Sequence, residues 1–249
     1  MEMKRIITAI VALLVMSTAA NADDEIPTID PIGYATSTEE GEQSGKSFSG
    51  SAPLVVSFKA NAQNTAGWNA YYEWRFTLTD LQGREEETPY LIRYEEDTEV
   101  TFTRAGMHKV ELYAVFTQGT DTVPYTEEYW QDAEKLTVSI SESHLEMPNA
   151  FSPNNGDDIN NIYGAKSNYK SIVEFHGYIF NRWGQKLYEW HDPAGGWDGK
   201  YKGTDVREGV YFLLCKAKGA DGVNYNFRKD VNLLRGFTES SQSSGTTTE

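Results

Sequence analysis

Apolar residues alternate with polar ones along several short stretches in the first half of this chain, and no stretch there carries a sustained apolar stripe at helical spacing. A period of two places successive side chains on opposite faces of an extended strand, so one face of each stretch is expected to be buried. Short strands separated by turns are typical of an antiparallel β-sandwich. The predicted strands cover residues 54–60, 71–78, 99–102, 110–116 and 136–140.

The second half also consists of short predicted strands separated by turns, with a different sequence. Its most apolar stretch, residues 209–218, is apolar on both faces, which predicts a central strand covered by two layers. Asp221 and Gly222 tolerate positive φ at little cost, so they predict a tight turn followed by an antiparallel return. We therefore expect an all-β chain with two tandem immunoglobulin-like antiparallel β-sandwiches, the second smaller than the first. The strands of the second sandwich are predicted at 172–180, 186–190, 209–218 and 223–234, with a turn at 181–184.

The N-terminus has the parts of a secretory signal peptide over residues 1–22. Lys4 and Arg5 precede an apolar run, and small residues follow at Ala20 and Ala22. The alternative is an uncleaved anchor, but the apolar run is about 15 residues, shorter than the roughly 20 that a membrane-spanning helix needs. Residues 23–51 are rich in Glu, Gly, Ser and Thr, which predicts a flexible acidic arm. We expect export through the inner membrane.

The negative charge is unevenly distributed. Residues 23–142 contain 8 Lys and Arg against 23 Asp and Glu, whereas residues 143–236 contain 12 against 11. This step predicts a domain boundary near residues 141–144. The acidic half argues against nucleic acid as a partner, because phosphates would be repelled rather than neutralised.

The second half contains four motifs in a specific order: PNAFSPNNGDD at 148–158, FNRWGQ at 180–185, GWDG at 196–199 and EGVYF at 208–212. In these motifs and their order, residues 146–236 resemble the gliding-motility-associated C-terminal domain, which is the type B sorting domain of type IX secretion in Bacteroidota. The resemblance implies export to the cell surface or the medium, with the periplasm as a transit or alternative compartment. It also implies the type IX translocon and an outer-membrane barrel protein as partners.

The first half contains APLVVSF at 52–58, YEWRF at 72–76 and RAGMHKV at 104–110. Through these segments, residues 52–142 are similar to PKD-like domains. Such modules pack a central tryptophan in the sandwich core, and Trp74 occupies that position. The sequence departs from the family at residues 77–80, TLTD, where a Gly-Asp-Gly turn is usual.

Residues 237–249 form a Ser/Thr-rich tail without apolar content, which predicts disorder. Members of the sorting family usually end within a few residues of the last strand. Three interpretations stay open for this tail: it is tolerated, it is trimmed, or the domain before it serves as a fixed structural module.

Residue patterns typical of catalysis are missing from the sequence. The four histidines, His108, His144, His176 and His191, are far apart and show no metal-ligand spacing. No Gly-rich phosphate loop, Gly-x-Ser-x-Gly elbow or His-Glu-x-x-His motif occurs. Cys215 lies in an apolar strand and is expected to be a buried hydrophobe rather than a nucleophile. We expect no enzymatic activity, no catalytic residue and no cofactor.

One short run resembles a cation site. Asn154, Asp157 and Asp158 gather hard oxygen atoms suited to calcium. A turn of this composition needs no ion, because Asn and Asp side chains cap their own backbone, and we favour the turn. We therefore predict no resident metal.

Recognition by the secretion machinery is predicted to use two turns and the cations of the last strand. Trp183 is either an exposed anchor at its turn or a lid folded over the core. The alternative function is an adhesion module in which the acidic half binds a protein or glycan and the C-terminal domain is structural. The predicted recognition residues are Arg182, Trp183, Gly184, Trp197, Asp198, Gly199, Arg228, Lys229 and Arg235.

Overall fold

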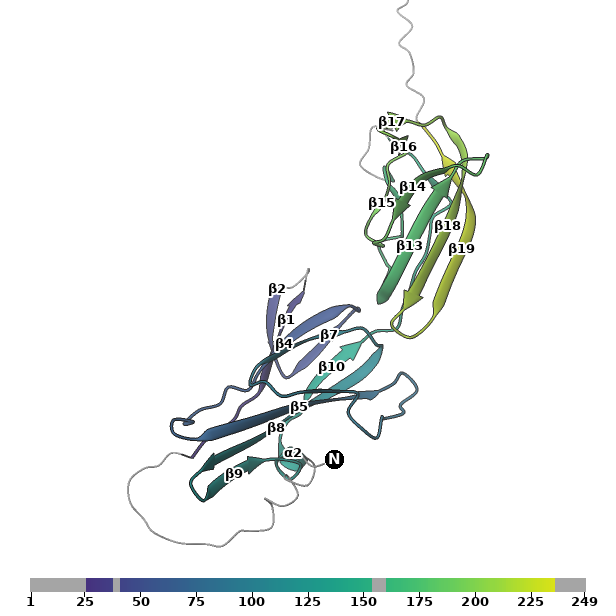
Figure 1. Ribbon diagram of the computed structural model, residues 1–249. Coiled ribbons are helices and arrows are strands. Elements are labelled where there is room, and N and C mark those ends of the chain that lie inside the picture. Colours follow the sequence, from purple (N-terminus) through teal and green to yellow (C-terminus); the bar gives the residue numbers. More distant parts are fainter. Residues whose placement is uncertain (1–25, 38–40, 154–159, 236–249) are drawn as a thin grey trace, which may run out of the picture.

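The computed structural model describes residues 26–37, 41–153 and 160–235. Strands dominate these residues, and the helix found among them is the short α2 (Tyr129–Asp132). No helix within the described ranges is long and apolar enough to cross a membrane. The prediction of an all-β chain built from immunoglobulin-like sandwiches is confirmed, and Figure 1 shows two such bodies joined end to end. The predicted signal peptide and the C-terminal tail lie outside the described residues.

The first sandwich packs a four-stranded sheet against a six-stranded one. The first sheet has the order β2 (Gly41–Gly45), β1 (Ile32–Ser37), β4 (Leu54–Lys59), β7 (Thr98–Phe102). The second has the order β3 (Ser47–Gly50), β10 (Leu136–Ile140), β8 (Gly106–Gln118), β5 (Asn69–Thr79), β6 (Leu91–Arg93), and β9 (Asp121–Tyr125) also pairs with β8.

Aromatic rings from both sheets fill the first core. Phe58 from the first sheet meets Phe76 from the second at a centroid distance of 5.8 Å and an interplanar angle of 64°. Edge contacts of this kind suit the ring quadrupoles and add to the area that they bury. Trp74 is fully buried, and its indole N–H donates to the carbonyl oxygens of Glu95 and Glu96 at 3.1 Å. The buried indole N–H therefore has hydrogen-bond acceptors, as buried polar groups in proteins normally do.

The prediction of a flexible arm over residues 23–51 is wrong for the part that the structure describes. That segment supplies β1, β2 and β3, and it buries Ile29, Ala35 and Phe48 in the first core. The alternation of apolar and polar residues is weak in this segment because small residues occupy the inner face of β1. Gly33 is one of them, and a Cβ there would lie 2.5 Å from Cε2 of Phe48. Backbone pairing with β4 and β10, together with the burial of Phe48, holds this segment in place.

The second sandwich has one large sheet and a covering layer of short ladders. The large sheet has the order β11 (Ala150–Phe151), β19 (Asn224–Leu233), β18 (Gly209–Gly219), β13 (Ile172–Phe180), β14 (Lys186–Trp190). The ladders pair β12 (Tyr163–Gly164) with β15 (Gly196–Trp197) and β16 (Lys200–Tyr201) with β17 (Thr204–Asp205). Core rings from both layers meet at Trp197, which lies 5.3 Å from Phe151 and 5.0 Å from Tyr211 between centroids.

Two expectations about the strands need correction. Residues 209–218 form the central strand β18, but only one face is covered: Leu213 and Cys215 are buried, while Val210 and Phe212 are 49% and 41% exposed. The covering layer lies on a single side of the sheet, so the outer face stays in solvent. The sandwiches are also not purely antiparallel, because β3 pairs parallel with β10 and β11 pairs parallel with β19. In each case the strand enters its sheet far along the chain from its partner, which leaves length for a crossover.

The two hydrophobic cores are separate, and polar groups at strand ends connect the two bodies. Ser171 Oγ accepts a hydrogen bond from the Ala52 N–H at 3.1 Å and lies 2.9 Å from Ser141 Oγ. The Ala105 N–H donates to the Ala220 carbonyl at 3.0 Å. Val173 and Ala220 of the second sandwich also pack against the first core, so the junction combines these apolar contacts with hydrogen bonds.

Replacing Phe48 with alanine tests the contribution of the N-terminal segment to the first core. Because Phe48 is buried, we expect a loss of about 3 to 5 kcal/mol in the free energy of unfolding. Urea denaturation followed by tryptophan fluorescence measures this loss. The substitution Ile26→Ala, at an exposed residue of the same segment, should change stability little. Equal, small effects of both substitutions would contradict the placement of the segment in the core.

Candidate recognition surface

The turn between β13 and β14 presents Trp183 to solvent. Asn181 shapes the turn, because its Oδ1 accepts the backbone N–H groups of Trp183 and Gln185, both at 3.0 Å. Gly184 has φ +77°, which a glycine adopts without strain. Trp183 is 77% exposed, and the Arg182 guanidinium lies 4.7 Å from its ring centroid. The lid alternative is thereby excluded: Trp183 stands outside the core.

The outer face of the large sheet forms an open groove beside this turn. Phe180 on β13 pairs with Phe212 on β18, and Leu214 on β18 pairs with Arg228 on β19. Alternation therefore places these four side chains on one face. The groove has a volume of about 480 Å³. We call it the hairpin groove; its lining residues are Phe180, Asn181, Arg182, Gly184, Phe212, Leu213, Leu214, Arg228, Lys229 and Asp230.

In the second predicted turn, the tryptophan and the last glycine are buried. Trp197 is fully buried, and its indole N–H donates to the Lys200 carbonyl at 2.7 Å. Gly199 is buried with φ +77°, and a Cβ there would meet Pro153 Cγ at 3.0 Å. Asp198 Oδ1 accepts the Lys200 N–H at 3.0 Å, which closes the turn. The prediction for Trp197 and Gly199 is wrong, because the core needs a large ring under the sheet and a glycine where the turn packs against it.

Two of the predicted cations are also committed within the fold. Arg235 donates from Nε and Nη2 to the Val206 carbonyl at 3.2 and 3.0 Å, and from Nη2 to the Gly199 carbonyl at 3.1 Å. Lys229 Nζ donates to the Met147 carbonyl at 2.6 Å. Arg235 thereby binds backbone carbonyls of the covering layer, and Lys229 binds the carbonyl of the segment that leads into β11. Of the predicted recognition residues, the structure brings Arg182, Gly184, Arg228 and Lys229 to the hairpin groove, with Trp183 at its border.

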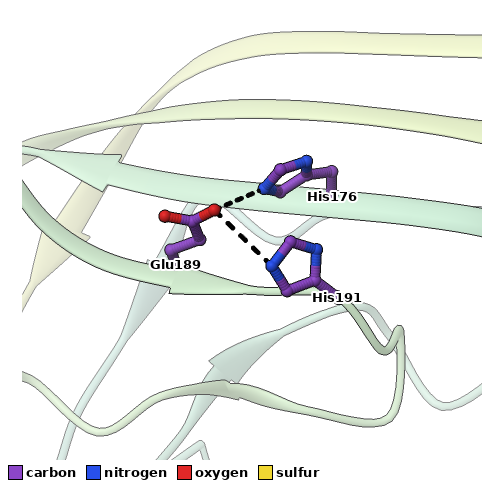
Figure 2. Close-up of side chains that lie close together, drawn as sticks. All are labelled: His176, Glu189 and His191. Carbon is purple, nitrogen blue, oxygen red and sulfur yellow. Dashed lines mark hydrogen bonds and ion pairs between the residues drawn. The ribbon is translucent and has the colours of Figure 1, made fainter.

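The same sheet face carries a cluster that was missed in the sequence. His176 Nε2 lies 2.7 Å from Glu189 Oε1, and His191 Nε2 lies 3.5 Å from the same oxygen (Figure 2). Lys186 contacts the other carboxylate oxygen. Hydrogen bonds from Lys186 and then from His176 lower the pKa of Glu189 to about 2, so its carboxylate is ionised at neutral pH. The sequence prediction that the four histidines form no metal-ligand arrangement is therefore wrong for two of them. The β13–β14 hairpin brings His176 and His191 together, although they are far apart along the chain.

The remaining reactive groups lie in the two cores. Cys215 is fully buried, and this burial raises the pKa of its thiol to about 12, so the thiolate is scarce near neutral pH. His108 is buried between Tyr90 and the Arg104 carbonyl, and burial lowers its pKa. The burial of Cys215 and His108 is therefore explained by their places in the two cores. The calcium candidates Asn154, Asp157 and Asp158 lie outside the described residues.

The second sandwich matches a known protein family. Residues 145–228 match the family model of the CHU_C type IX secretion signal domain, which confirms the resemblance found in the motifs. A domain of this class implies recognition by the type IX secretion machinery and export to the cell surface or the medium. No curated protein matches the sequence. The PKD-like character of the first sandwich stays a prediction, compatible with its immunoglobulin-like fold.

Several solved structures resemble the chain distantly. Dimeric latent PorU from Porphyromonas gingivalis is 12% identical, with a TM-score of 0.24, over 86% of this chain and 20% of PorU. The SGBP-B protein of the Bacteroides ovatus mixed-linkage glucan utilization locus, solved with a heptasaccharide, is 14% identical. Its TM-score is 0.26, over 84% of this chain and 47% of that protein. The chain thus spans less than half the length of either structure, and we draw no functional conclusion from them.

A pair of tryptophan substitutions tests this assignment of surface and core. Trp197→Ala should lower the free energy of unfolding by about 3 to 5 kcal/mol, because it empties the centre of the second core. Trp183→Ala should change it by about 0.5 kcal/mol or less, because the indole is largely in solvent. Thermal denaturation of both variants is the measurement. A strongly destabilised Trp183→Ala protein would contradict the exposed position.

Proposed function

We propose that this protein is a non-enzymatic cargo or accessory protein of type IX secretion. The second sandwich is the sorting module, and the first sandwich is its passenger or spacer. The observation that carries the proposal is the family match at residues 145–228, which coincides with a sandwich that has its own hydrophobic core. A sorting module needs a self-contained fold, because it must present one surface whatever passenger precedes it.

The hairpin groove is the proposed contact with the translocon or its outer-membrane barrel partner. Tryptophan and arginine are the residues most enriched at energetic centres of protein interfaces. Arg182 stacks on Trp183, which orders both side chains before a partner arrives and reduces the entropy lost on binding. Phe180, Phe212 and Leu214 supply an apolar floor, and Arg228 adds a second cation. The groove fits an apolar or aromatic side chain followed by an acidic group.

Chemistry within the described residues supports a non-enzymatic role. The one thiol is buried with a raised pKa, and the buried histidine is held between two hydrogen-bond partners. The hairpin groove carries cations and aromatic rings, which suit binding rather than nucleophilic or acid–base catalysis. The acidic first sandwich fits a soluble passenger, because its charge disfavours self-association.

Deleting residues 143–249 tests whether the second sandwich directs export. We expect the truncated chain to be retained in the periplasm, because the translocon would have no signal domain to recognise. Cell fractionation and protease accessibility on intact cells measure the outcome. Surface delivery of the truncated chain at the level of the full chain would refute the proposed function.

Substitutions in the groove give a sharper test within the full chain. Trp183→Ala combined with Arg228→Glu should reduce surface delivery about tenfold or more, because tryptophan and arginine are the residue types whose loss costs most at protein interfaces. The matched control combines Val223→Ala and Lys218→Glu, an exposed apolar residue and an exposed cation at the far end of the same β18–β19 hairpin from the groove. Both proteins should keep the unfolding midpoint of the wild type. If the two double variants reach the surface equally well, the hairpin groove is not the recognition surface.

A second candidate function is adhesion through the first sandwich. Tyr71 and Tyr94 are exposed, and their ring centroids lie 6.1 Å apart, an arrangement on which a sugar ring can stack. Glu73 is hydrogen-bonded to Tyr71 and paired with Arg75 at 2.6 Å, so polar groups flank the rings. A glycan array probed with the full chain and with Tyr94→Ala distinguishes this function. Glycan binding that Tyr94→Ala abolishes would favour adhesion over a spacer role.

A further inference from the structure

The register of the β13–β14 hairpin gathers two imidazoles and a carboxylate on the exposed sheet face. Gly177 pairs with Trp190, so the flanking residues His176 and His191 face each other, and Tyr178 pairs with Glu189. His191 directly follows β14, two positions after Glu189, and its side chain lies on the same side of the hairpin as Glu189. Figure 2 shows the three side chains converging between the two strands.

Three donor atoms, one from each side chain, lie within 4.8 Å of one another. Glu189 Oε1 is 2.7 Å from His176 Nε2 and 3.5 Å from His191 Nε2, and the imidazole centroids are 4.0 Å apart. Two ligands at about 2.1 Å from a tetrahedral metal lie about 3.4 Å from each other. The carboxylate and His191 already have this spacing, and the distance between the carboxylate and His176 needs to lengthen by only about 0.7 Å to reach it.

We propose that His176, Glu189 and His191 form a binding site for a divalent cation of the zinc class. Two imidazole nitrogens and one carboxylate oxygen are the donor set that Zn²⁺ accepts with a fourth position open. Hard cations such as Mg²⁺ and Ca²⁺ prefer oxygen donors, so this set disfavours them. The fourth position faces solvent, because His191 is 66% exposed in its side chain. Water or a partner side chain can complete the coordination.

Neighbouring groups prepare the site for a metal. Tyr178 Oη lies 3.1 Å from His176 Nδ1, so it can accept a hydrogen bond from Nδ1–H when Nε2 binds a cation. Outer contacts of this kind orient metal-binding imidazoles and select their tautomer. Lys186 contacts Glu189 Oε2, which leaves Oε1 directed at both histidines. Lys186 also stays bound to the carboxylate when the cation replaces the hydrogen bond between His176 and Glu189.

A simple ion pair is the competing explanation, and the His144–Glu146 pair is the matched example of one. His144 Nε2 lies 3.3 Å from Glu146 Oε1 on the surface of the same sandwich, and Lys166 contacts Glu146 Oε2. This pair repeats the carboxylate, the lysine and one histidine but lacks the second imidazole. A cation that needs three protein ligands should therefore bind at His176, Glu189 and His191 but not at the His144–Glu146 pair.

The test is calorimetric titration of the full chain, without a polyhistidine tag, with zinc chloride. We expect saturable binding of one Zn²⁺ per chain, reversed by EDTA, and a rise in Tm with zinc, because the cation binds the folded hairpin only. His191→Ala should weaken the affinity at least tenfold, since loss of an outer-shell partner alone costs about 10- to 100-fold. His144→Ala should leave it unchanged.

A spectroscopic readout separates coordination from a structural effect of the substitution. Long-range ¹H–¹⁵N spectra should show the Nε2 resonances of His176 and His191 moving on zinc addition while those of His144 and His108 stay in place. Absence of saturable zinc binding would overturn the proposal. Equal affinity in His191→Ala, or a loss in His144→Ala, would overturn it as well. None of these outcomes bears on the secretion function, which rests on the family match and the groove.

Discussion

Burial on one side of the large sheet is the constraint on which the second sandwich depends. Tyr163 and Trp197 come from the covering layer, and their rings pack against Phe151 and Tyr211 on the inner face of the large sheet. No described element covers the opposite face, so its alternate residues are free to serve another purpose. The hairpin groove and the histidine cluster both lie on that face. A sheet covered on both sides would have buried them.

The inner face also determines how the outer face is arranged. Gly177 leaves room for Trp190 to cross the strand beneath it, where a Cβ would lie 2.6 Å from the indole. That packing holds β13 and β14 in one register, and a shift by one residue would move every side chain to the other face. The histidine cluster therefore depends on a glycine–tryptophan contact in the core. Surface chemistry is positioned here by packing rather than by contacts among the surface groups.

Strands with strong alternation were predictable, and their predicted bounds agree closely with β4, β5, β10 and β13. The N-terminal strands were not, because Gly33 and Ala35 on the inner face of β1 carry almost no hydrophobic signal. The exposure of Phe212 was not predictable from the sequence around it. Apolar residues on both faces of a strand predict two covering layers, and β18 has only one. The proximity of His176 and His191 depends on hairpin register, which residue spacing along the chain does not reveal.

Trp183 and Trp197 show why the recognition surface was only partly predictable. Each tryptophan stands beside a turn glycine in a motif shared with the sorting family, and local sequence treats the two turns alike. The difference arises from the layer to which each turn belongs. Asn181 closes the first turn through its own side chain, so the indole of Trp183 is not needed for packing and projects outward. The second turn belongs to the covering layer, whose short ladders supply few other large residues, so Trp197 must fill the core. A turn motif in this domain thus indicates function only where the turn can fold without its aromatic residue.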